Sequence, residues 1–109
     1  MMQKVIIDMH GKQQVCELKI DGVLYADTDG NKLVVVHLSK KYFPFCSFNK
    51  RWLAVDSKTG LYVFGEKTKK ELIESMSTYN QDRYQRYIEF IKSNNYQKAI
   101  IDCRKIIGW

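Results

Sequence analysis

The chain has 109 residues, of which 45% are hydrophobic and 28% are charged, and its formal net charge is +6. This composition is typical of one globular domain with a modest core and argues against a disordered chain. Its three cysteines, Cys16, Cys46 and Cys103, are odd in number and widely spaced, which excludes a disulfide framework. No apolar run approaches the ~18 residues of a membrane span, and no signal-like apolar stretch follows the first residues. We therefore expect a single domain over residues 1–109, in the cytoplasm and without a membrane partner.

Alternation of apolar and polar residues predicts four short strands in the first part of the chain. They cover residues 4–9, 14–20, 23–26 and 32–38. Asp21 and Gly22 favour a tight hairpin turn, because a type I′ turn needs positive φ at both of its central residues. Residues 32–38 are apolar on both faces, so we expect this strand at the centre of the sheet, covered on both sides.

Two further strands and then a change of period follow. Residues 52–56 and 61–64 are expected to pair around a turn at 58–60. Thr68, with Glu71 three residues later, forms a capping-box pattern in which each side chain bonds to a backbone N–H of the other residue. The first helix is therefore predicted to begin at this point.

Helical spacing of apolar residues predicts two more helices. Asp82 is expected to cap the second helix, Asn94 and Asn95 to end it, and Tyr96 to begin the third. The expected inner faces are Tyr84, Tyr87, Ile88 and Ile91 in the second helix and Ile100, Cys103 and Ile107 in the third. Strands in one block and helices in the next indicate an α+β fold. We expect an antiparallel sheet of five to six short strands over residues 4–64, followed by two to three helices over 68–107 packed on one face.

The positive charge of the chain is concentrated in residues 40–70. This stretch carries eight Lys/Arg and two Asp/Glu, a net of +6, against −1 for residues 1–39 and +1 for residues 71–109. Residues 40–52 also hold five of the fourteen aromatic side chains. Cations interleaved with rings suit a polyanion whose bases can stack. The candidate binding residues here are Lys40, Lys41, Tyr42, Phe43, Lys50, Arg51 and Trp52.

The alternative for this segment is structural: its aromatic residues belong to the core and fix a long loop, and its lysines are merely solvated. A second cationic group, Lys67, Lys69 and Lys70, surrounds the predicted start of the first helix, where backbone N–H groups favour an anion. Glu71 and Glu74 oppose an anion there, so a solvated helix start is the competing interpretation. Lysine outnumbers arginine fourteen to four, which argues against base-specific recognition.

Catalysis, a metal ion and a cofactor are not expected. The histidines lack the closely spaced partners that a zinc site needs, and His37 is expected to lie in the core. A thiol nucleophile would require Cys103 or Cys46 to meet His37, with Asp102 or Asp56 to orient the imidazole. However, Cys103 falls on an apolar helix stripe, where cysteine is a small buried hydrophobe. The run from Asp27 to Asn31 resembles half of a calcium loop without its remaining ligands, which favours a simple turn.

These observations lead to one functional hypothesis and two alternatives. We expect a small non-catalytic binding protein that docks on nucleic acid, or on a nucleic-acid-handling complex, through residues 40–70. The first alternative is a small inhibitor or adaptor, of phage or mobile-element type, that covers an acidic or nucleic-acid-binding surface of a partner protein. The tyrosines of the C-terminal half favour a protein interface, because tyrosine is enriched at such surfaces. Tyr84 and Tyr87 are expected to face the sheet, whereas Tyr79 and Tyr96 are the candidates for exposed positions. A thiol enzyme is a distant third.

Overall fold

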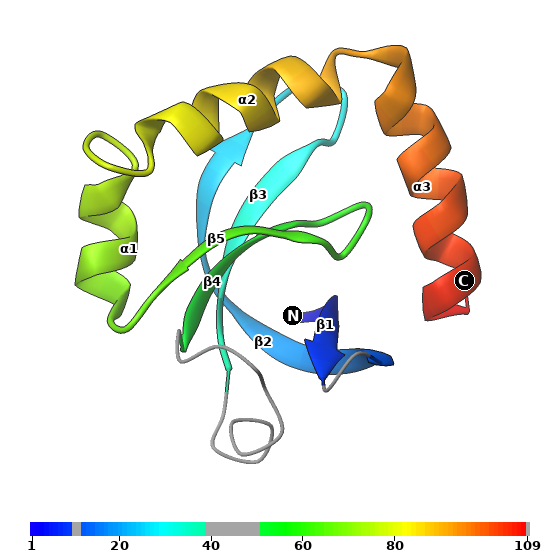
Figure 1. Ribbon diagram of the computed structural model, residues 1–109, viewed down its shortest axis with the longest axis horizontal. Coiled ribbons are helices and arrows are strands. Elements are labelled where there is room, and N and C mark those ends of the chain that lie inside the picture. Colours follow the sequence, from blue (N-terminus) through cyan, green and yellow to red (C-terminus); the bar gives the residue numbers. More distant parts are fainter. Residues whose placement is uncertain (10–11, 39–50, 109) are drawn as a thin grey trace.

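The computed structural model describes residues 1–9, 12–38 and 51–108 of the chain. Within these residues, five strands precede three helices (Figure 1), which confirms the predicted α+β fold. The strands are β1 (Met2–Met9), β2 (Lys12–Ala26), β3 (Lys32–His37), β4 (Trp52–Asp56) and β5 (Tyr62–Glu66), and the helices are α1 (Lys69–Ser75), α2 (Gln81–Ile91) and α3 (Asn94–Ile107).

The strands pair in chain order, and every pairing is antiparallel. The long strand β2 serves two neighbours, since its first part pairs with β1 and its second part with β3. The register shifts between Ile20 and Val23, where Gly22 has a φ of 154°. The prediction of a hairpin turn at Asp21 and Gly22 is therefore wrong: these residues form a β-bulge, which bends the strand without ending it.

The sheet curls until its two edge strands meet. The backbone N–H of Ile6 in β1 donates to the carbonyl of Gly60 at 2.8 Å, and Ile6 forms a parallel bridge with Leu61, just before β5. The concave face encloses one apolar cluster, here called the sheet core. Its members are Val5, Ile7, Cys16, Leu18, Val34, Val36, Leu38, Leu53 and Val55.

The opposite face of the sheet packs against the helices, which follow one another around it (Figure 1). This second cluster, the helix core, consists of Leu33, Val35, Ala54, Phe64, Leu72, Tyr87, Ile91, Tyr96 and Ile100. Strand β3 contributes to both clusters, with Val34 and Val36 on one face and Leu33 and Val35 on the other. The prediction that residues 32–38 form a strand covered on both sides is confirmed.

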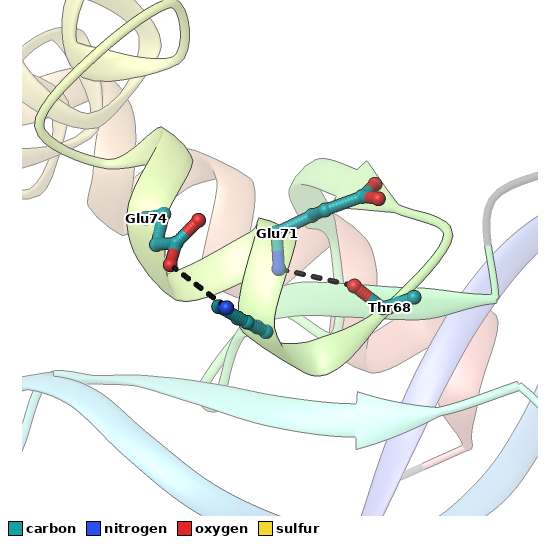
Figure 2. Close-up of polar contacts among 4 residues, drawn as sticks. Thr68, Glu71 and Glu74 are labelled. Carbon is teal, nitrogen blue, oxygen red and sulfur yellow. Dashed lines mark hydrogen bonds and ion pairs between the residues drawn. The ribbon is translucent and has the colours of Figure 1, made fainter.

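The helix boundaries follow local capping. Thr68 is the N-cap of α1, and its Oγ1 accepts a hydrogen bond from the N–H of Glu71 at 3.1 Å (Figure 2), as the capping-box pattern predicted. Helix α2 begins after Asn80 rather than at Asp82, which lies in its first turn. None of the helices in the described part of the chain is long and apolar enough to cross a membrane.

The break predicted at Asn94 and Asn95 is shifted. The chain leaves α2 at Lys92, and Ser93 is the N-cap of α3. Both asparagines then lie in the first turn of α3, so this helix begins two residues before the predicted Tyr96. Asparagine suits a helix start as well as a break, because its side chain bonds readily to nearby backbone groups.

Candidate functional site

Backbone pairing brings two separate basic stretches to one end of the sheet. The N–H of Leu38, after β3, donates to the carbonyl of Arg51 at 2.6 Å, and the N–H of Arg51 donates to the carbonyl of Glu66 at 3.2 Å. Because Glu66 ends β5, Arg51 lies beside the residues that lead into α1. We call this end of the molecule the basic edge, formed by Arg51, Trp52, Lys67, Lys69 and Lys70. The other candidate binding residues, Lys40, Lys41, Tyr42, Phe43 and Lys50, lie outside the described residues.

Trp52 carries the aromatic surface of the basic edge. It opposes His37 across the β3–β4 pairing, and the two rings stack with centroids 4.4 Å apart and planes inclined by 32°. Trp52 is half-buried and packs partly against the helix core, so it has both a structural role and an open part. His37 is exposed, and its prediction as a core residue is wrong. β3 ends at His37, beyond the helix core that covers Leu33 and Val35.

The lysines of α1 are only weakly engaged. Lys69 lies 3.7 Å from a carboxylate oxygen of Asp21, and Lys70 lies 4.0 Å from Glu74 (Figure 2). These side chains are between 41% and 84% exposed, and ion pairs this exposed contribute little to stability. No ion pair is recorded for Lys67 with any described residue. Since Thr68 already accepts from a backbone N–H of the first turn, the side chains rather than the helix start offer the cationic surface.

The residues weighed for thiol chemistry are not brought together where the structure describes them. Cys103 is buried on α3, and desolvation raises the pKa of its thiol, assisted by the negative charges of Asp102 and Asp56. His37 opposes Trp52 at one end of β4, whereas Asp56 forms the other end, four residues or roughly 13 Å along the strand. Cys46 lies outside the described residues.

The turn between β2 and β3 is held by hydrogen bonds to the Asp27 carboxylate. Asp27 Oδ1 accepts from the N–H groups of Asp29 and Asn31, and Oδ2 accepts from the Asn31 side chain at 2.9 Å. The Asn31 amide lowers the pKa of the Asp27 carboxyl. Over residues 1–9, 12–38 and 51–108, no group of three or more His, Cys, Asp or Glu side chains has the arrangement of a metal site.

A buried polar network lies at the far end of β4 from the basic edge. The Asp56 side chain is almost fully buried and accepts from the hydroxyl of Tyr87 at 2.7 Å and from the hydroxyl of Tyr96 at 3.0 Å. Thr59 adds its N–H at 3.1 Å and its hydroxyl at 2.7 Å. Burial raises the pKa of both phenols, with Asp56 adding to the effect. The network therefore fixes α2, α3 and the turn after β4 to one carboxylate.

The tyrosines divide between core and surface. Tyr87 and Tyr96 are buried, and Tyr84 packs against the helix core, so the prediction that Tyr84 and Tyr87 face the sheet is confirmed. Tyr79 is 67% exposed on the segment between α1 and α2. Desolvation raises the pKa of Tyr79, and a hydrogen bond with Glu66 contributes. Tyr79 is thus the most exposed tyrosine of this group.

Next to the Asp56 network, a pocket of about 390 Å³ opens between β5 and α2. Leu61, Tyr62 and Val63 line one side, and Tyr87 and Phe90 line the other. Two exposed arginines of α2, Arg83 and Arg86, line the pocket on the same side as Tyr87 and Phe90. Its exposed lining is almost entirely apolar.

Neither the network nor the pocket was predicted from the sequence. A usable signal was present in β4, where Asp56 ends an otherwise apolar strand and therefore needs buried donors. In α2, Arg83, Arg86, Tyr87 and Phe90 recur at intervals of three and four residues, which places them on one face. Comparison with protein-family models, curated proteins and solved structures finds no match for this chain.

Proposed function

We propose that the protein is a small non-catalytic binding protein of the cytoplasm that docks on nucleic acid, or on a nucleic-acid-handling complex, through the basic edge. The observation that carries this proposal is the convergence of Arg51 and Trp52 with Lys67, Lys69 and Lys70 at one end of the sheet. Three further lysines of the basic stretch 40–70, Lys40, Lys41 and Lys50, lie in the sequence between Leu38 and Arg51, which are hydrogen-bonded at the same end.

The side chains at this edge suit the phosphate backbone better than the base edges. Lysines act as mobile point charges, and the three on α1 and its N-terminal approach have at most weak, exposed ion pairs to give up. Trp52, stacked on His37, offers a ring beside these cations. A single-stranded nucleic acid could place its phosphates along these lysines and one base against the Trp52 ring. Such a complex would form with little sequence preference. Its affinity would fall as salt rises.

The first test is fluorescence anisotropy of labelled single- and double-stranded oligonucleotides at low and near-physiological salt. The test variant is Lys67→Glu/Lys69→Glu/Lys70→Glu. The control is Lys92→Glu/Lys98→Glu/Lys105→Glu, which makes the same change in net charge on exposed positions of α3 and the end of α2. We expect micromolar binding that weakens with salt and falls by about tenfold or more in the test variant, with a much smaller loss in the control. Equal losses in both variants would contradict a localised site.

The fluorescence of Trp52 provides a second, independent test of nucleic-acid binding. In a Trp109→Phe background the remaining tryptophan fluorescence comes from Trp52. Stacking of a base on the indole should quench this fluorescence in step with the anisotropy change. If the anisotropy rises while the Trp52 fluorescence stays constant, the oligonucleotide binds without stacking on Trp52. That result would support the phosphate contacts and contradict the proposed base stacking.

An inhibitor or adaptor of phage or mobile-element type is the alternative, and one observation favours it. Ile73 on α1 and Tyr79 after it are 48% and 67% exposed near the lysines, and large exposed apolar and tyrosine side chains are typical of protein interfaces. If no oligonucleotide binds at low salt, this surface becomes the candidate. A partner recovered by the wild-type chain but not by Ile73→Glu/Tyr79→Ala would support it, and recovery by both would exclude this surface.

A further inference from the structure

We infer that the pocket between β5 and α2 binds an organic anion with a flat apolar body of about two rings. This site is separate from the basic edge and does not depend on the function proposed there. The basic edge includes Trp52 at one end of β4, whereas the pocket is bordered by Asp56 at the other end of that strand.

The size and lining of the pocket define the body of the ligand. Leu61, Tyr62 and Phe90, which line it, remain 37%, 42% and 37% exposed, so the pocket offers large apolar side chains to a ligand. A cavity of about 150 Å³ is sufficient for one benzene ring, so 390 Å³ has room for a fused two-ring system with a substituent. Pockets of this volume lie within the usual range for small-molecule sites.

The back of the pocket is already ordered. Tyr87 is held by Asp56 at 2.7 Å, and Thr59 is held by the same carboxylate. Phe90 packs edge-to-face on Tyr96, with ring centroids 5.5 Å apart and planes inclined by 77°. A ligand therefore does not have to order these walls, which removes a cost that weakens binding to flexible surfaces.

The charges at the pocket select an anion. Arg83 and Arg86 stand one helical turn apart, and no ion pair is recorded for Arg83 with any described residue. Arg86 is paired with Asp82 at 2.9 Å, but both side chains are about three-quarters exposed, so a ligand carboxylate can take the place of Asp82 at little cost. Guanidinium groups bind carboxylates and sulfonates through paired N–H donors.

The remaining charge at the pocket is Asp56, which would repel an anion if it faced the ligand. It is 3% exposed, and its oxygens accept hydrogen bonds from the Tyr87 and Tyr96 hydroxyls and from two groups of Thr59. These donors compensate its charge locally, whereas the guanidinium groups of Arg83 and Arg86 are solvent-accessible. An anionic head at the arginines, with its ring system against Leu61 and Phe90, satisfies both parts of the site.

The test uses naphthalene-2-carboxylate and its neutral analogue 2-naphthalenemethanol, titrated into the full-length ¹⁵N-labelled protein. We expect saturable shifts in the backbone amides of residues 61–63 and 83–90, with the carboxylate bound about tenfold more tightly than the alcohol. The basic edge should remain unshifted. Absence of saturable shifts at millimolar concentration, or shifts centred on residues 67–70, would overturn the inference.

The variant Arg83→Gln/Arg86→Gln separates charge from shape. Both side chains are exposed, so the fold should be preserved, which the amide spectrum checks directly. Carboxylate affinity should fall about tenfold while that of the alcohol stays constant. The control, Lys98→Gln/Arg104→Gln on α3, removes the same charge and should change neither. Equal affinity for carboxylate and alcohol in the wild-type chain would reduce the site to an apolar surface. Oligonucleotide binding, measured in parallel, should be the same in both variants.

Discussion

At the scale of single residues, Asp56 links two of the helices to the sheet. A carboxylate this deeply buried is tolerated only with donors around it, and Asp56 has the hydroxyls of Tyr87, Tyr96 and Thr59 together with a backbone N–H. The three side chains come from α2, α3 and the turn after β4. Specific hydrogen bonds therefore supplement the less directional packing of the helix core in setting the relative positions of these segments.

The two tyrosines of this network predict how stability depends on alkaline pH. Burial raises the pKa of Tyr87 and Tyr96 in the folded chain, whereas in the unfolded chain a tyrosine titrates near pH 10. Their contribution is therefore fully present below about pH 10 and is lost as the pH rises above it, because the unfolded chain then releases protons that the folded chain keeps. We expect the free energy of unfolding to fall steeply above pH 10, and less steeply in Tyr96→Phe.

Urea unfolding at a series of alkaline pH values measures this slope. Phe90→Leu is the control, because it disturbs the ring that packs on Tyr96 but removes no ionisable group. It should lower stability at every pH and leave the slope as in the wild-type chain. Identical slopes for Tyr96→Phe and the wild-type chain would show that Tyr96 does not titrate differently in the folded and unfolded states.

The positions of some of these residues could be predicted from the sequence, and those of others could not. Tyr87 was placed on the inner face of α2 by helical spacing, and the structure confirms it. His37 was assigned to the core from strand alternation, but alternation gives the face of a strand and not how far along that face the helices extend. The two tyrosine partners of Asp56 are distant in the chain, Tyr87 by 31 residues and Tyr96 by 40, so no local pattern connects them to it.

At the scale of elements, the closure between β1 and the turn before β5 depends on Gly60. This residue has a φ of 76°, and a Cβ atom there would lie 2.8 Å from the carbonyl oxygen of Lys4 and 3.0 Å from Ile107. Its own carbonyl accepts the N–H of Ile6. A side chain at this position would therefore push β1 and the end of α3 away from the turn.

Gly60→Ala should lower the free energy of unfolding by about 3 kcal/mol, of which about 1 kcal/mol is the cost of positive φ. Gly108→Ala is a matched control, because Gly108 has a φ of 84° but nothing lies within 4 Å of its added Cβ. It should show only the backbone cost, about 1 kcal/mol. Urea unfolding of both variants measures the difference, and equal losses would mean that the turn moves freely to accept a side chain.

Elements with strong local signals were predicted well, and those that depend on pairing were not. The capping pattern of Thr68 and Glu71 placed the start of α1 correctly, because both partners lie within one turn. Asp21 and Gly22 predict a hairpin turn from the sequence. The same dipeptide also suits a bulge, and only the pairing with β1 and β3 decides between them. The sequence therefore predicted one strand too many in this region.

At the scale of the whole molecule, the sheet core and the helix core share β3. Val36 lies in the sheet core and Val35 in the helix core, and they are adjacent in one strand. Loss of packing on one side therefore disturbs the strand that supports the other. We expect the two cores to unfold together rather than as separate units.

Val35→Ala and Val36→Ala test this coupling, and each should destabilise the chain by about 2 kcal/mol through a cavity in its own core. In a Trp109→Phe background, Trp52 fluorescence reports on the helix side, and far-ultraviolet circular dichroism reports on the whole sheet and helices. The two signals should give one midpoint in urea for either variant. Separate midpoints in Val36→Ala would show that the helix core persists without the sheet core.

Charge distribution along the chain predicted which part of the molecule is basic, but not its shape. Counting side chains located the surplus in residues 40–70. The meeting of Arg51 with Lys67 depends on the register between β4 and β5, in which Trp52 opposes Glu66. Because β4 is buried on both faces, its apolar residues run continuously and do not by themselves specify this register.

The hydrogen bond between Leu38 and Arg51 has a consequence for engineering. It joins the two ends of residues 39–50, so the sheet on either side is already complete at the point where the chain leaves and returns. The entropic cost of closing a flexible loop between fixed ends rises by only about 0.6 kcal/mol each time the loop doubles in length. We therefore expect β3 and β4 to keep their register when a foreign sequence is placed between Leu38 and Arg51, which would make this small domain a carrier for inserted peptides.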